Sequence, residues 1–414
     1  MRIGSTNRLI FVALSAVIWI SNASLAQDSV VNRPKRRTFG FSLRDLNPAK
    51  EKGKSKTHKH DPAKSALPET SDDVVKVETL LAVFDLLVTD SYGKPVETLN
   101  KSDFTVSEDG IQQTVTQFTK GDETQDGRSI VLVLEWSNTA HYVEKSLEAA
   151  QTFIEKLRPQ DYVAVVTTDI KLVCDFTNNK EKLRSVLHTL KNRLSRGPEP
   201  SLPAESVLPK EQFEFETLIA VLQELLDSPE RHIIIFQADG GEVLYLRDQA
   251  LANSPVPPPV RKISLANVLS VVTGSRSTTI YSVIPDYQYL GLTPEEQMNR
   301  ARESMKDQVR YLPESQQHLF FNPSRLRNIV DSAVLAQTSL MSVSQLSGGW
   351  SAYLERPDHA EYIYSQILAD ANQRYVLAYP IIDKTRDGRV RSVSIRVQGH
   401  PEYHIQARQS YALR

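Results

Sequence analysis

The stretch RSIVLVLEWSNT, residues 128–139, decides the fold of this 414-residue chain. Five consecutive apolar residues, 130–134, lie between polar ends, which is typical of a strand buried on both faces of a helix-covered parallel sheet. Glu135, Ser137 and Thr139 follow its carboxyl end. Ligands of open α/β sheets bind at that end of the strands, so these oxygen-bearing side chains are candidate ligands of a hard cation. The alternative is an ordinary buried strand followed by a polar loop.

The alternation of strands and helices continues from this strand to residue 354. Further strands are predicted over 162–168, 172–176, 232–236, 278–284 and 350–354, and helices over 143–157, 180–190, 213–226, 262–272 and 329–346. The strand over 172–176 is close enough to its predecessor to pair with it antiparallel. This order predicts an α/β domain over 128–356 with a doubly wound, mostly parallel sheet. Residues 286–326 are charged and partly helical, and we expect a surface excursion or lid there.

Strands are also predicted on both sides of this domain. Residues 72–121 form a small β module in which Asp109-Gly110 joins two β runs, a strong hairpin signal, with the second run over 113–118. Residues 357–414 contain a predicted helix over 359–371 and three strand-like runs. Because isolated hairpins are marginally stable, we expect the strands of both segments to form one accessory β-sandwich, with the C-terminal helix grouped with them.

The stretch Glu135-Trp136-Ser137-Asn138-Thr139 resembles the first metal-site motif of von Willebrand factor A domains, Asp-x-Ser-x-Ser, with Glu in place of the Asp. Asp239, after the strand over 232–236, resembles the Asp of the Thr-Asp-Gly element, and Ala238 replaces its Thr. Thr217 is the nearest match to the loop Thr of these domains, but FEFE replaces the Gly-rich lead-in. The departures leave two alternatives open, a metal-binding site and a degenerate site without metal.

The resemblance implies that these residues approach one cation, Mg²⁺ or Mn²⁺. Ser137, Thr139, Thr217 and Asp239 would lie around it, and Glu135 would contact it directly or through water. Such sites leave one coordination position for an acidic group of a partner protein.

A longer signature resembles the exported VWFA-related domain proteins of the acidobacterial type. In the β module the matching residues are Asp90, Gly93, Lys94, Pro95, Val96, Leu99, Asp103, Phe104, Val106, Glu108, Asp109, Gly110 and Gln113. Towards the C-terminus they are 346–349, Tyr375, Leu377, Tyr379, 387–389, Arg391, Val393, Ile395, Val397, Ala407, Arg408 and Tyr411. The resemblance covers residues 75–414 and implies an exported protein. This family is defined by its domain architecture, so the resemblance implies no particular biochemical activity.

The N-terminus predicts export. Arg2 and Arg8 precede the apolar run 9–20, and Ser24 and Ala26 have the spacing of a signal-peptidase site, so residues 1–26 read as a cleaved signal peptide of a secreted or periplasmic protein. No later run predicts a transmembrane segment in the mature chain. Residues 27–71 hold few apolar side chains and much positive charge, which predicts a disordered basic linker. The linker is a flexible tether or a loose contact with an anionic envelope surface.

The sequence favours binding over catalysis. It contains no G-x-S-x-G or H-E-x-x-H motif, and its nine His are scattered. It also lacks the glycine-rich motifs of dinucleotide and P-loop sites, and no nucleic acid partner is expected. We therefore expect a protein-interaction module, adhesion-like or scaffold, for an unidentified protein. The alternatives are a metal-independent structural component of the cell envelope and, less favoured, a hydrolase.

Overall fold

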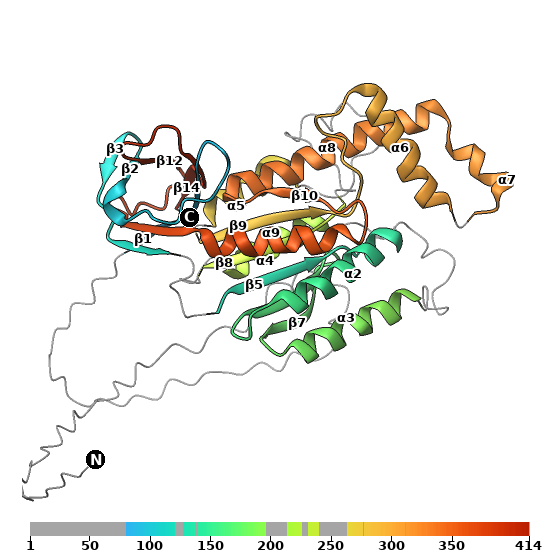
Figure 1. The fold of residues 1–414 in the computed structure, drawn as a ribbon, viewed down its shortest axis with the longest axis horizontal. Helices are drawn as coiled ribbons and strands as arrows, with labels where there is room; N and C mark the ends of the chain where they lie inside the picture. Colours follow the sequence, from blue (N-terminus) through green and yellow to red (C-terminus); the bar gives the residue numbers. More distant parts are fainter. Residues whose placement is uncertain are drawn as a thin grey trace, which may run out of the picture. The chain divides into compact units, whose positions relative to one another are not determined.

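A six-stranded sheet with helices on both faces forms the centre of the fold (Figure 1). The structure is a computed structural model that describes residues 80–120, 127–136, 140–195, 213–225, 231–239, 263–275, 277–310 and 312–413. The strands of the central sheet are β5 (Ser129–Leu134), β6 (Tyr162–Thr167), β7 (Lys171–Thr177), β8 (His232–Gln237), β9 (Thr278–Ile284) and β10 (Ser351–Tyr353). The α/β class predicted from the sequence is confirmed.

The order of the strands in this sheet is β10-β9-β8-β5-β6-β7. All neighbouring pairs are parallel except β6 and β7, which pair antiparallel as predicted. Numbered along the chain, this is the order 3-2-1-4-5-6 of a doubly wound sheet. The chain proceeds from β5 towards one edge, then returns and continues from β8 towards the other edge. The switch point therefore lies between β5 and β8.

Helices cover both faces of the sheet because the apolar residues of β5 alternate between two cores. Ile130, Leu132 and Leu134 belong to one core, with α2 (Ala140–Lys156), α3 (Lys180–Ser195) and α9 (His359–Gln373). Val131 and Val133 belong to the other, with α4 (Glu214–Leu225), α5 (Leu265–Gly274) and α8 (Pro323–Ser347). Burial on both faces explains why β5 reads as a continuous apolar run.

Strands from the two ends of the described chain form two antiparallel sheets around one common core. One sheet has the order β13-β1-β11-β4 and the other β14-β12-β2-β3. Their bounds are β1 (Leu81–Thr89), β2 (Phe104–Glu108), β3 (Ile111–Gln113), β4 (Gln117–Lys120), β11 (Tyr375–Pro380), β12 (Val390–Val397), β13 (His404–Ala407) and β14 (Ser410–Ala412). We call these eight strands the sandwich.

Two details of the sandwich region differ from the prediction. The run over 113–118 is not one strand: it breaks around the buried Val115, so that β3 pairs with β2 and β4 pairs with β11 of the opposite sheet. The C-terminal helix α9, which we had grouped with the sandwich, packs instead on α2 in the α/β part. Its apolar stripe, which includes Ile363, Tyr364 and Ile367, is buried there.

Polar contacts join the sandwich to the α/β part. Asp85 of β1 accepts hydrogen bonds from Arg231 Nε and Thr279 Oγ1, both over 2.9 Å. The guanidinium of Arg374, which pairs with Asp370 of α9, donates to Asp85 O of β1 over 3.4 Å. Arg408 donates to Val272 O and Thr273 O at the end of α5 and to Thr278 O. These buried and partly buried contacts connect the amino end of the central sheet to the sandwich.

The predicted excursion consists of α6 (Pro294–Val309), the short helix α7 (Glu314–Gln317) and a 3-10 turn, His318–Phe320. It leads into α8, which begins at Pro323, six residues before the predicted start. Tyr289, Met305 and Val330 belong to a separate small core under this excursion. Among the described residues, no helix is both long enough and apolar enough to cross a membrane.

Candidate functional site

Three carboxylates meet at the switch point of the central sheet. Glu135 follows β5, Asp239 follows β8, and Glu214 is the first residue of α4. Each offers one oxygen, and these three oxygens lie within 4.8 Å of one another. Glu135 and Glu214 are buried, whereas Asp239 is half-buried. We call these three residues the carboxylate cluster.

The extra methylene of Glu135, compared with the Asp of the motif, lets its side chain reach the neighbouring strand end. Its Oε2 accepts a hydrogen bond from the backbone N–H of Asp239 over 3.0 Å. This bond ties the end of β5 to the end of β8. It also fixes the orientation of the Glu135 carboxylate within the cluster.

Of the five predicted site residues, Glu135 and Asp239 are brought together. Ser137 and Thr139 lie outside the described residues. Thr217 lies inside α4, one turn after Glu214, and is fully buried. Its hydroxyl donates to Thr168 O over 3.0 Å and accepts from Ile170 N over 3.2 Å. Thr217 therefore holds the turn between β6 and β7, and the third carboxylate comes from Glu214.

The turn that Thr217 holds is strained. Ile170 has a φ of 60°, in the left-handed region that β-branched residues rarely adopt. The same turn supports the site, because Thr168 Oγ1 accepts a hydrogen bond from Trp136 N over 2.8 Å. Thr217 thus acts as a positioning residue, since it links α4, which carries Glu214, to the backbone that follows Glu135.

Asp286, two residues after β9, extends the acidic edge. Burial, supported by the charge of Asp239, raises the pKa of Asp286 to about 6. Ser304 Oγ of α6 donates to Asp286 Oδ1 over 3.4 Å, and the Asp286 carboxylate also interacts with the Tyr142 hydroxyl of α2. Asp286 thereby connects the excursion to the first helix of the site.

Basic side chains of α2 face the same region. Burial lowers the pKa of Lys145, whose ammonium lies 5.8 Å from the ring centre of Tyr142 and 5.7 Å from that of Tyr287. Burial, assisted by the charge of Lys145, lowers the pKa of His141 to about 4. The imidazole of His141 is therefore neutral at pH 7, and Lys145 is the nearest positive charge to Asp286 on this helix.

The carboxylate cluster fits a hard divalent cation. Oxygens on opposite sides of Mg²⁺ are about 4.2 Å apart, because each lies about 2.1 Å from the ion, and around Ca²⁺ they reach about 5 Å. The three carboxylate oxygens lie within 4.8 Å of one another, which is compatible with a shared divalent cation after small side-chain movements. Carboxylate oxygens are also the ligand type that both ions prefer.

Sequence reasoning missed Glu214 and Asp286. Glu214 belongs to the FEFE that replaces the expected Gly-rich lead-in, so the departure from the family pattern is itself the source of the third carboxylate. Asp286 could have been found by the rule that identified Asp239, because it too follows the carboxyl end of a parallel strand.

Comparisons with known proteins add little to this geometry. No protein-family profile and no curated protein match the chain. Among solved structures, the chain is similar to the conserved hypothetical protein BatB from Bacteroides thetaiotaomicron, with 9% sequence identity and a TM-score of 0.30. The match covers 59% of this chain and 99% of the BatB chain. A similarity this weak assigns no function.

Proposed function

We propose that this chain is an exported protein-interaction module of the von Willebrand A-like type that binds an acidic group of a partner protein through a divalent cation. The observation that carries the proposal is the carboxylate cluster at the switch point between β5 and β8, the place where open α/β sheets bind ligands. The resemblance of residues 75–414 to VWFA-related domain proteins supports it. The signal-like N-terminus supports a secreted or periplasmic location.

In this proposal Glu135, Glu214 and Asp239 hold the ion, and the backbone N–H of Asp239 orients Glu135. When bound, Mg²⁺, Mn²⁺ or Ca²⁺ would supply a Lewis-acidic position for a partner carboxylate. Ionised carboxylates this close repel one another, and a bound cation would offset that repulsion. The proposed role is binding and not catalysis, as the sequence favours.

A metal-independent scaffold in the cell envelope is the second candidate. The hydrogen bonds of the Thr217 hydroxyl to the backbone of residues 168–170 favour this second candidate, because they give that hydroxyl a structural role in place of metal binding. On this alternative the carboxylates of the cluster would be held by protein contacts alone.

Thermal unfolding of the full mature chain separates the two candidates. The expected midpoint rises with millimolar Mg²⁺, Mn²⁺ or Ca²⁺ relative to EDTA, by the equivalent of about 2.7 kcal/mol at a hundredfold excess over the Kd. Glu214→Gln should abolish this rise because it removes one of the three carboxylates that would hold the ion. Glu224→Gln, at the other end of α4 and outside the cluster, is the matched control. Identical midpoints with and without each ion would favour the metal-independent scaffold.

A further inference from the structure

The strand β10 is an edge strand with an open hydrogen-bonding side. It is the outermost strand next to β9 in the order of the central sheet. The ladder to β9 uses alternate residues: Ser282 N donates to Trp350 O, and Leu354 N donates to Ile284 O. In a parallel ladder the intervening residues, Ser351 and Tyr353, point their N–H and C=O groups away from β9. Among the described residues, no strand pairs with that side, and β10 is partly exposed.

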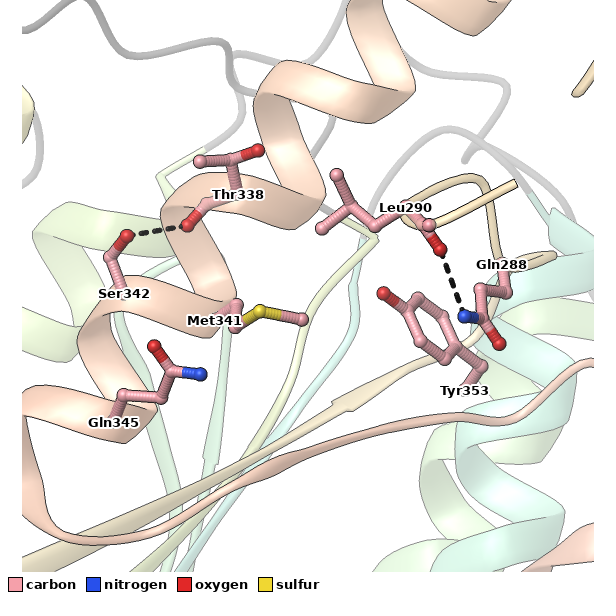
Figure 2. Close-up of a pocket in the computed structure, with 8 residues that line it drawn as sticks. Gln288, Leu290, Thr338, Met341, Ser342, Gln345 and Tyr353 are labelled. Carbon is pink, nitrogen blue, oxygen red and sulfur yellow. Dashed lines mark hydrogen bonds between the residues drawn. The ribbon is translucent and has the colours of Figure 1, made fainter. Parts of the chain in front are cut away.

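A pocket of about 520 Å³ lies next to this open edge. Figure 2 shows Tyr353 on one side of it and the α8 residues Thr338, Met341, Ser342 and Gln345 on the other. These four residues are spaced three and four apart, so they form one stripe along α8. Gln288, Leu290 and Gly291 complete the lining. The pocket is therefore a groove between a helix stripe and the end of β10.

The groove is uncharged and offers hydrogen bonds of both kinds. The buried hydroxyl of Tyr353 has no hydrogen-bond partner in the part of the chain that the structure describes, so it can donate. Thr338 and Ser342 already donate to Val334 O and Thr338 O, each over 2.7 Å, and therefore offer lone pairs. Gln288 Nε2 donates to Leu290 O over 2.9 Å. An entering side chain meets a donor on one wall and acceptors on the other.

We propose that β10 and this groove bind an extended peptide of a partner protein by strand addition. The peptide backbone pairs with Ser351 and Tyr353, and an uncharged side chain, best a carboxamide, enters the groove. In strand addition the main-chain bonds give affinity and the pockets beside the strand give specificity. A carboxamide accepts from Tyr353 and donates to the hydroxyls of α8, whereas a carboxylate or ammonium would lose its hydration without a counter-charge. This surface does not depend on the carboxylate cluster.

The test uses a random ten-residue peptide library displayed on phage and selected on the full mature chain. Ser342→Arg places a long charged side chain in the groove, whereas Ser332→Arg makes the same change at an exposed position of α8 outside it. Selected peptides, remade synthetically, should bind the Ser342→Arg variant at least about tenfold more weakly and the Ser332→Arg variant as well as the unmodified chain. Circular dichroism checks that both variants are folded.

A second measurement needs no protein variant. N-methylation removes one backbone donor of the peptide at a time, and strand pairing predicts that alternate positions lose roughly tenfold in affinity while intervening positions do not. Replacing a Gln or Asn of the peptide by Glu or Asp should also weaken binding.

The proposal is overturned if no selected peptide distinguishes Ser342→Arg from Ser332→Arg, or if the N-methylation series shows no alternation. Binding should be unchanged in EDTA and in the Glu214→Gln variant. Loss of peptide binding under either condition would place the peptide at the carboxylate cluster and overturn the proposal for β10. An absent metal effect on stability, in contrast, would leave this result untouched.

Discussion

At the scale of single residues, two buried ionisable groups near the carboxylate cluster have opposite pKa shifts. Asp286 has a pKa of about 6 and His141 a pKa of about 4, each because burial disfavours its charged form. Because the pKa of Asp286 is raised, the stability that its neutral carboxyl contributes is full at about pH 4 and below, and it is lost as the pH rises through 6. Because the pKa of His141 is lowered, the stability that its neutral imidazole contributes is full above pH 6.5, and it is lost as the pH falls towards 4.

These two dependences overlap and oppose each other, each with a size of about 3 kcal/mol. We expect single variants to separate them. Relative to the unmodified chain, Asp286→Asn should gain stability as the pH rises from 4 to 6.5, and His141→Gln should lose stability over the same range. Urea midpoints measured at half-unit pH steps test this. Profiles of both variants that run parallel to that of the unmodified chain would show that the groups do not titrate as described.

The sequence identified some residues of the site and not others for physical reasons. Glu135 and Asp239 were found because the position after a buried parallel strand can be read from local periodicity. Glu214 could not be found this way, since a helix start shows its approach to a strand end only after folding. Arg391 is charged, yet it lies on the same buried face of β12 as Val393 and Val397, which the sequence pattern alone does not predict.

At the scale of elements, the turn between β6 and β7 shows how a short connection is stabilised against strain. Thr217→Val should leave Thr168 O and Ile170 N without their partner and lower the free energy of unfolding by about 1–3 kcal/mol. Thr217→Ser retains the hydroxyl and should cost about 1 kcal/mol or less for its lost methyl. A Thr217→Val variant as stable as the unmodified chain in chemical unfolding, together with a less stable Thr217→Ser, would assign the role of Thr217 to packing alone.

Several residues that carry the resemblance described in the sequence analysis have structural roles at this scale. A Cβ on Gly349 would lie 1.9 Å from Ile280 O, so the glycine permits β10 to approach β9. The Asp109-Gly110 pair forms a turn with both φ angles positive, as two-residue hairpins prefer. The hydroxyls of Tyr379 and Tyr411 both donate to Glu108 over 2.8 Å. These signature residues build the scaffold, which is why they predicted the fold better than the function.

At the scale of the whole molecule, Arg408 couples the sandwich to the α/β part. Arg408→Met would leave the carbonyls of Val272, Thr273 and Thr278 without this donor and should cost about 2–4 kcal/mol. The exposed Arg396 on β12 provides the matched control, since Arg396→Met should change stability by less than about 0.5 kcal/mol.

The same variant should also reduce cooperativity. Trp136 and Trp350 both contact the α/β core, so their fluorescence follows that part, whereas circular dichroism follows both parts. We expect the two signals to coincide during urea unfolding of the unmodified chain and to separate in Arg408→Met. Coinciding transitions in the variant would mean that other contacts suffice for the coupling.

The pairing of β1 with β11 has a consequence for how the protein is made. Asp85 of β1 lies opposite Val376 of β11. Nearly three hundred residues are therefore synthesised between β1 and the strand with which it pairs. The α/β part lies wholly between them and can fold during synthesis, whereas the sandwich must assemble last. A nascent chain that stops before β11 therefore presents β1 as an unprotected template for other strands. Delivery of the last forty residues is the step that removes this aggregation hazard.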